Sequence, residues 1–327
     1  MTLVSVAPAQ VQQIRVGEVE FYGAAGVDVE KLRAALPFKE GETITKGAGE
    51  RKSEQAEQTI RQLTGRAPTE IAKICCDERG GLIIFIGLSG QTMRYLPEPK
   101  GTARFPSSVN KLFEEWSNTL TEAISRGASG EDWSQGYALS KDYPQLRAIQ
   151  LRMRDYALEH AALILRVLES SADGNQRAMA AELLGYARQS GSQLKALERA
   201  SSDGNDDVRN NATRALLVLV RARPELAGRI QPLVFIKMLM SGTWTDVNKS
   251  SGLLDGLTKS RNPQLLAKLR QPAVTERLIE IARWRTFHAN SARMILGRIA
   301  GIDETRLTQL VAAGQVDQII SALHNAR

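Results

Sequence analysis

The sequence predicts a small α+β module followed by an all-α, right-handed solenoid of helical repeats. Two observations lead to this fold class. Residues 165–184 and 194–216 are two copies of one helical pattern, and residues 11–90 alternate short strand-like and helix-like runs. A chain of 327 residues is also long enough for two domains.

Each copy of the helical pattern is a short apolar helix, a polar Asp-Gly-Asn turn and a second helix with a small residue. The turns lie at residues 173–175 and 203–205, and the small residues are Ala180 and Ala212. One such hairpin of helices cannot bury its apolar face alone, so copies stack on one another. Two later copies follow the same register around Ser250 and Ala292.

The sequence of the second helix in the second copy resembles that of a known repeat family. It reads Val208-Arg209-x-x-Ala212-x-x-Ala215-Leu216, and with the leucines of the first helices it resembles HEAT repeats. The resemblance covers about residues 145–327 and implies an armadillo-like α-solenoid. It also implies that an Asp/Arg pair, here Asp203 and Arg209, ties adjacent turns together. HEAT-like stacks serve as scaffolds, transport receptors, bilin lyases and DNA glycosylases.

The N-terminal module spans residues 11–90. Its predicted elements are a strand at 11–21, helices at 28–36 and 51–63, and strands at 71–76 and 82–88. This β-α-α-β-β order, with Leu36-Pro37-Phe38-Lys39-Glu40-Gly41 before the second helix and Gly80-Gly81 before the last strand, resembles a POTRA domain. The resemblance implies partners that add a strand to the sheet edge, and it brings no catalytic residue.

Two further segments complete the predicted organisation. Residues 91–140 read as a linker that contains one amphipathic helix at 110–125, and residues 141–327 hold the repeats. Residues 1–10 read either as a ragged terminus or as the remnant of a secretory signal, with Ala7-x-Ala9 as a cleavage motif. The second reading predicts an exported or periplasmic protein, and the alternative is a cytoplasmic one.

Cys75 and Cys76 are adjacent, near the end of a predicted strand whose successive side chains point to opposite faces. Disulfides prefer Cα atoms that are further apart than those of neighbouring residues. We therefore expect one buried and one exposed thiol. Two cysteines without a second pair also make a structural zinc site improbable, and the sequence predicts no metal site.

Charge is unevenly distributed along the chain. Residues 1–139 carry 16 Lys/Arg and 18 Asp/Glu, a net charge of −2, and residues 140–327 carry 27 and 18, a net charge of +9. A basic helical half attracts acidic proteins, anionic lipid or nucleic acid. The favoured interpretation is that arginine stems cover apolar surface between helices.

One cluster near the end of the repeats combines cations with aromatic rings. The candidate binding residues are Arg283, Trp284, Arg285, Phe287 and His288, with Trp244 and Asp246 about one repeat earlier. Such a cluster suits stacking on bases or binding an acidic peptide. The alternative is that Trp284 and Phe287, three residues apart, serve packing between helices.

The sequence contains no nucleophile elbow, no phosphate-binding glycine loop and no paired His/carboxylate motif. It therefore predicts no catalytic residue and no cofactor. The predicted function is a non-catalytic scaffold that holds a protein or peptide partner on the inner face of the solenoid. The alternatives are a cytoplasmic nucleic-acid-binding or DNA-repair protein, and a small-molecule role like that of bilin lyases. The oligomeric state stays open.

Overall fold

The computed structural model describes residues 13–91, 93–128 and 130–326, and it divides into two compact units. The first unit contains the described residues up to Ser89 together with Arg285–Phe287, and the second contains the remainder. The predicted cleavage motif at residues 7–9 lies outside the described residues. Within those residues, no helix is both long and apolar enough to cross a membrane.

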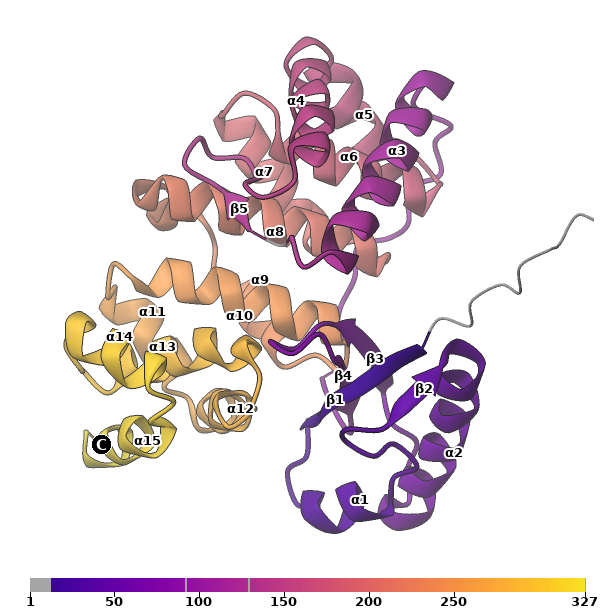
Figure 1. Cartoon of the computed structure of the whole chain (residues 1–327). Helices are drawn as coiled ribbons and strands as arrows, with labels where there is room; N and C mark the ends of the chain where they lie inside the picture. The colour runs from indigo at the N-terminus through magenta and orange to yellow at the C-terminus, as the bar shows by residue number, and fades with distance from the viewer. Residues whose placement is uncertain (1–12, 92, 129, 327) are drawn as a thin grey trace, which may run out of the picture. The chain divides into compact units, whose positions relative to one another are not determined.

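The first unit is a four-stranded sheet with two helices (Figure 1). Its elements are β1 (Gln13–Tyr22), α1 (Val29–Ala35), β2 (Thr43–Thr45), α2 (Lys46–Thr64), β3 (Glu70–Cys75) and β4 (Leu82–Gly87). The strand order is β2-β1-β4-β3, with β1 parallel to β4 and the other pairs antiparallel. Every predicted element has a counterpart, and the structure adds the short strand β2, which the sequence analysis does not predict.

Helices α1 and α2 pack on the sheet through one apolar cluster. Its fully or almost fully buried members include Val16, Val19, Phe21, Leu32, Leu36, Ile60, Ile84 and Ile86. Alternate residues of a strand share a face, which is why Val19 and Phe21 of β1 both enter this core. Asp28 caps α1 by accepting a hydrogen bond from the backbone N–H of Lys31 at 3.0 Å.

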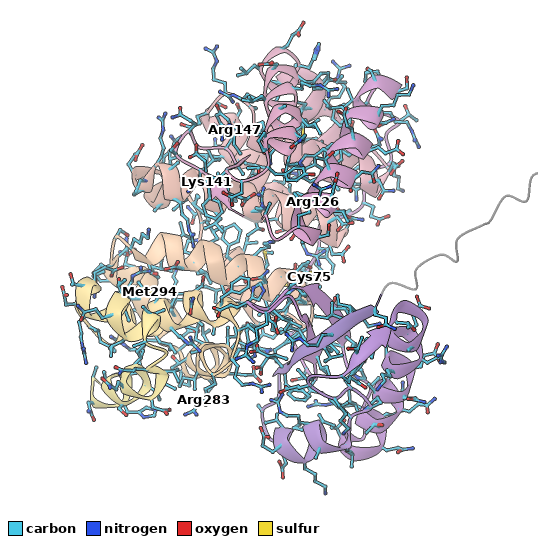
Figure 2. All side chains as sticks on the ribbon, in the orientation of Figure 1. Cys75, Arg126, Lys141, Arg147, Arg283 and Met294 are labelled. Atoms are coloured by element: carbon cyan, nitrogen blue, oxygen red, sulfur yellow. A yellow bond between two sulfur atoms is a disulfide. The ribbon has the colours of Figure 1, made fainter. Side chains whose placement is uncertain are left out.

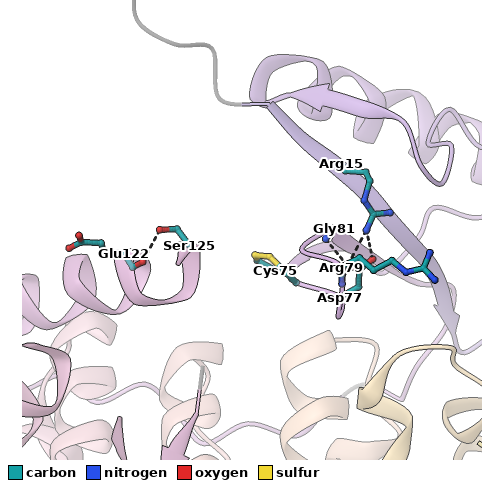
Figure 3. Close-up of a disulfide and its surroundings, with 8 residues drawn as sticks. Arg15, Cys75, Asp77, Arg79, Gly81, Glu122 and Ser125 are labelled. Carbon is teal, nitrogen blue, oxygen red and sulfur yellow. Dashed lines mark hydrogen bonds and ion pairs between the residues drawn. A yellow bond between two sulfur atoms is a disulfide. The ribbon is translucent and has the colours of Figure 1, made fainter. Parts of the chain in front are cut away.

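The prediction of two free thiols is wrong, because Cys75 and Cys76 form a disulfide (Figure 3). The peptide bond between them is cis, and their Cα atoms lie 3.0 Å apart. The sequence argument assumed a regular strand, in which neighbouring side chains point apart. The strand β3 ends at Cys75, so that alternation does not extend to Cys76.

The second unit is a stack of helix pairs. Its repeat elements are α4 (Pro144–Glu159), α5 (Ala161–Ser170), α6 (Gly174–Gly185), α7 (Gly191–Ala200), α8 (Asp206–Ala222), η1 (Pro224–Arg229), α9 (Leu233–Leu239), α10 (Trp244–Thr258), α11 (Pro263–Leu269), α12 (Pro272–Ala282), η2 (Phe287–Ala289), α13 (Asn290–Ile299), α14 (Glu304–Ala312) and α15 (Val316–Asn325). Helices α5, α7, α9, α12 and α14 each pack on the helix that follows them, and the second helices α6, α8, α10, α13 and α15 pack on one another in succession. The predicted armadillo/HEAT-like solenoid is therefore confirmed, and its handedness stays a prediction.

Small residues allow the second helices to approach closely. The equivalent residues Ala180, Ala212, Ser250 and Ala292 are all completely buried. A Cβ atom added to Gly252 of α10 would lie 3.1 Å from a methyl group of Leu217 in α8. Close-packed interiors leave no room for such an atom without a shift of the neighbour, so the small residues set the spacing of the stack.

Buried ion pairs join successive repeats. The guanidinium of Arg177 lies 2.8 Å from the Asp203 carboxylate in the next repeat, and that of Arg209 lies 2.7 Å from Asp246 in the repeat after. The hydrogen bond from Arg177 to Asp203 raises the pKa of the arginine. Asp203 and Arg209 are therefore structural, as the HEAT resemblance implies, but each forms its ion pair with another repeat and not with the other.

The structure corrects the predicted linker, because the described residues between 90 and 140 belong to the second unit. They contain α3 (Ser107–Ser125) and a small sheet of β5 (Glu131–Asp132) and β6 (Leu139–Ser140). Residues 91–105, which we call the strap, hydrogen-bond to turns of three successive repeats. These bonds join Gln91 N to Met240 O at 2.7 Å, Leu96 N to Ser202 O at 2.8 Å, and Ala172 N to Gly101 O at 2.8 Å. Composition suggested a linker, but these backbone pairings hold the strap in place.

Candidate functional site

The predicted tryptophans of the repeat region lie together. The ring centroids of Trp244 and Trp284 are 5.6 Å apart, and each side chain is 3% exposed. The His288 ring meets Trp244 edge-on at 5.1 Å. This arrangement matches the packing interpretation of the cluster, since edge-on and tilted ring contacts are typical of buried aromatic residues.

The other predicted residues do not converge on one surface. Asp246 is completely buried in its ion pair with Arg209, and Arg285 binds the carboxylates of Glu20 and Glu40 within the first unit. Arg283, labelled in Figure 2, directly follows α12 as its C-cap, and its exposed side chain lies 3.5 Å from Asp317. Phe287 is 51% exposed. Partner binding by this set stays a prediction.

Burial controls the charge of His288. Its Nδ1 lies 3.3 Å from Oδ1 of Asn248, and burial, reinforced by the positive charge of Lys249, lowers its pKa to about 4. The ring is therefore neutral at neutral pH, which suits packing against Trp244 and removes one cation from the predicted cluster.

His288 should make the second unit less stable in mild acid. The unfolded chain binds a proton near the usual pKa of 6.5, whereas the folded ring does so only near pH 4, so stability is lost as the pH falls between these values. The loss attributable to this ring is about 3 kcal/mol. Urea unfolding of wild type and His288→Gln at several pH values between 4 and 6.5 measures this loss of stability. Parallel pH profiles for the two proteins would contradict the prediction.

A cavity of about 330 Å³ lies beside the second helices α6, α8 and α10. Its polar lining comes from three successive repeats, namely Glu182 of α6, Asn210, Asn211 and Arg214 of α8, and Lys249 of α10. The lining also contains Trp116, Leu120 and Ile124 of α3, Glu131 of β5, and Leu146 and Gln150 of α4. We call this cavity the α3 pocket.

Arg214 is shared between two carboxylates in the α3 pocket. It donates a hydrogen bond to Glu131 and lies 3.5 Å from Glu182. Burial raises the pKa of Glu182. Burial also opposes the charge of Arg214, but the two carboxylates outweigh it and raise the pKa of the guanidinium. Glu131 is held further by the indole N–H of Trp133 at 3.0 Å.

Lys249 differs from Arg214 in having no ion pair among the residues that the structure describes. Burial, followed by repulsion from Arg214, lowers its pKa to about 8. The buried indole N–H of Trp116 also meets no acceptor in the described part of the chain. The pocket therefore contains an amine without an ion pair, and one of its lining residues, Trp116, has an inaccessible indole N–H without an acceptor.

The sequence analysis missed the α3 pocket, although the repeat register contains a signal for it. Asn211 and Lys249 each stand one position before the small residue of their copy, and Asn210 stands next to Asn211. Polar residues at one register position of successive copies line up along a stack. The apolar wall could not be found this way, because α3 lies outside the repeats.

No group of three or more His, Cys, Asp or Glu residues in the described ranges is arranged to hold a metal ion. No protein-family model matches the chain, and no curated protein matches it. Among solved structures, the chain is similar to one described as "Designed armadillo repeat protein YIII(Dq)4CqI". The two are 13% identical, the match covers 59% of this chain and 98% of that chain, and the TM-score is 0.39.

Proposed function

We propose that this chain is a non-catalytic scaffold whose second helices hold a protein or peptide partner at the α3 pocket. One observation carries the proposal: polar side chains from three successive repeats and an apolar wall from α3 line a single cavity. Repeat stacks typically bind along such extended surfaces. A cavity with an apolar wall and a few convergent polar groups is also the usual form of a binding site.

The disposition of the arginines favours a protein partner over nucleic acid. Nucleic-acid binding needs exposed cations that can neutralise phosphates. Arg177, Arg209 and Arg298 are buried and paired with carboxylates. These three arginines, out of 27 Lys and Arg residues in the helical half, therefore join helices of the stack.

We also propose that the protein is exported and that its first unit is POTRA-like. The disulfide between Cys75 and Cys76 supports export, because disulfides persist mainly in oxidising compartments. The strand β3 lies at an edge of the sheet, where a partner strand can pair with it. Fractionation of producing cells tests export, and recovery in the cytosol with both thiols reduced would contradict it.

Capture from a cell-envelope extract tests the scaffold proposal. Wild type, Ile124→Glu and Leu158→Glu are compared as bait, since both side chains are exposed, at 39% and 43%, and only Ile124 lines the α3 pocket. We expect wild type and Leu158→Glu to retain the same partner and Ile124→Glu to lose it. Equal capture by all three baits would contradict the proposed site. Binding of DNA with a steep salt dependence, and of no protein, would support the nucleic-acid alternative instead.

A further inference from the structure

We infer that the α3 pocket binds a carboxylate attached to a small apolar group, and that the amine of Lys249 is its counter-ion. This inference rests on the proposed binding function of the same pocket and names the chemistry that it recognises. Two sources carry that chemistry: the C-terminal residue of a peptide and a free small carboxylic acid.

The hydrogen-bond donors among the lining residues indicate that the ligand carries an acceptor. The indole N–H of Trp116 is buried without an acceptor among the described residues, and Lys249 lacks an ion pair there. An unsatisfied buried donor destabilises a protein by about 1–3 kcal/mol. A ligand carboxylate in the pocket would pair with the ammonium group of Lys249, and the ring of Trp116 beside it would report the ligand's presence.

The two carboxylates and the Gln150 amide oxygen of the pocket already have partners. Glu131 accepts hydrogen bonds from Arg214 and Trp133, and Glu182 faces Arg214. The side-chain oxygen of Gln150 accepts the backbone N–H of Ser140 at 2.7 Å. A cationic or purely donating ligand would therefore compete with existing bonds, whereas a carboxylate uses groups that have none.

The apolar wall and the volume limit what the carboxylate is attached to. Leu120, Ile124 and Leu146 line the pocket together with the indole of Trp116. A volume of about 330 Å³ is at the lower end of the range for ligand pockets. It suits one apolar side chain with its carboxylate and is too small for a folded element.

Protonation of Lys249 makes the expected affinity depend on pH. The titratable groups that act on its amine are Arg214, Glu131, Glu182 and His288, and burial with the repulsion of Arg214 lowers its pKa to about 8. The carboxylate stays ionised over the alkaline range, so binding follows the ammonium form. We expect affinity to fall about tenfold from about pH 7 to about pH 9.

Indole N–H resonances of the full chain, labelled with 15N-tryptophan, test the inference. The variant Trp116→Phe assigns the Trp116 signal among the four tryptophans. N-acetyl-leucine should shift this signal, and N-acetyl-leucinamide, which lacks the carboxylate, should not. The peptide Ala-Ala-Leu distinguishes the two sources, and its C-terminal amide is the control that lacks the carboxylate. If Ala-Ala-Leu binds more tightly than N-acetyl-leucine, the ligand is a peptide C-terminus. If it binds more weakly, the ligand is a small acid.

Matched lysine variants test the counter-ion. Lys249→Gln should weaken N-acetyl-leucine binding at least about tenfold, which is the loss expected for removing one paired charge in a pocket. Lys259→Gln changes an exposed lysine at the end of the same helix and should bind like wild type. Lys249→Arg should recover part of the affinity and abolish its pH dependence near pH 8.

The outcomes separate this inference from the proposed function. Equal shifts by acid and amide, or unchanged binding by Lys249→Gln, would overturn the inference. If Ile124→Glu loses a captured partner while no carboxylate shifts the Trp116 signal, the inference is overturned and the scaffold proposal stands. If a carboxylate binds through Lys249 but no partner is captured, the inference holds for a small acid and the scaffold proposal fails.

Discussion

Replacing Arg209 with alanine should lower the free energy of unfolding of the second unit by about 3–5 kcal/mol. The substitution leaves the carboxylate of Asp246 buried without its cation, and Asp246 is completely inaccessible to solvent. The remaining hydrogen bond from Ser241 Oγ, at 3.0 Å, does not neutralise that charge. Urea unfolding followed by circular dichroism measures the shift of the transition.

Two controls make the Arg209 result specific to a buried pair. Arg283→Ala removes an exposed pair with Asp317 and should leave the transition nearly unchanged, because exposed pairs contribute little. The double variant Arg209→Met/Asp246→Leu removes both charges and should regain most of the lost stability. If Arg209→Ala unfolds at the same urea concentration as Arg283→Ala, the role of this ion pair in joining repeats is contradicted.

Replacing Phe105 with alanine should destabilise the second unit by about 3–5 kcal/mol. Phe105 ends the strap, is 5% exposed and packs edge-on against Tyr156. Its backbone N–H donates to Gln176 Oε1 at 2.8 Å in a buried bond, so loss of the ring also exposes that bond to water. Urea unfolding gives the magnitude, and limited proteolysis shows whether residues 91–105 become accessible.

Leu233→Ala is the matched control for the Phe105 experiment. Leu233 is 52% exposed in α9, and its replacement should change neither the unfolding transition nor the cleavage pattern. If Phe105→Ala behaves like Leu233→Ala, residues 91–105 act as the linker that composition predicts. Early cleavage within 91–105 in the Phe105 variant supports a docked strap.

The candidate cluster shows why a pattern of residue types is not enough to locate a site. A sequence in which cations alternate with aromatic residues is the same whether these side chains face a ligand or a neighbouring helix. The spacing of the residues does not show which side chains are exposed. The contact between Trp244 and Trp284 joins segments forty residues apart, and the ion pair of Asp246 joins two repeats. Neither partner is visible from local sequence.

The disulfide and the strap illustrate the same limit. The disulfide between Cys75 and Cys76 is a feature of the folded chain, and no composition rule predicts it. The proline- and glycine-rich residues 91–105 have linker composition, yet their backbone groups find partners on the turns at Met240, Ser202 and Ala172. Those turns come close together only after the repeats have stacked.

The sequence by itself determined the α+β start and the helical repeats. These features depend on local periodicity, caps and small residues that recur at one register, such as Ala180 and Ala212. Only the tertiary structure decided which residues share the α3 pocket. Trp116, Arg214 and Lys249 are far apart in the chain, and stacking of three repeats beside α3 brings them to one cavity.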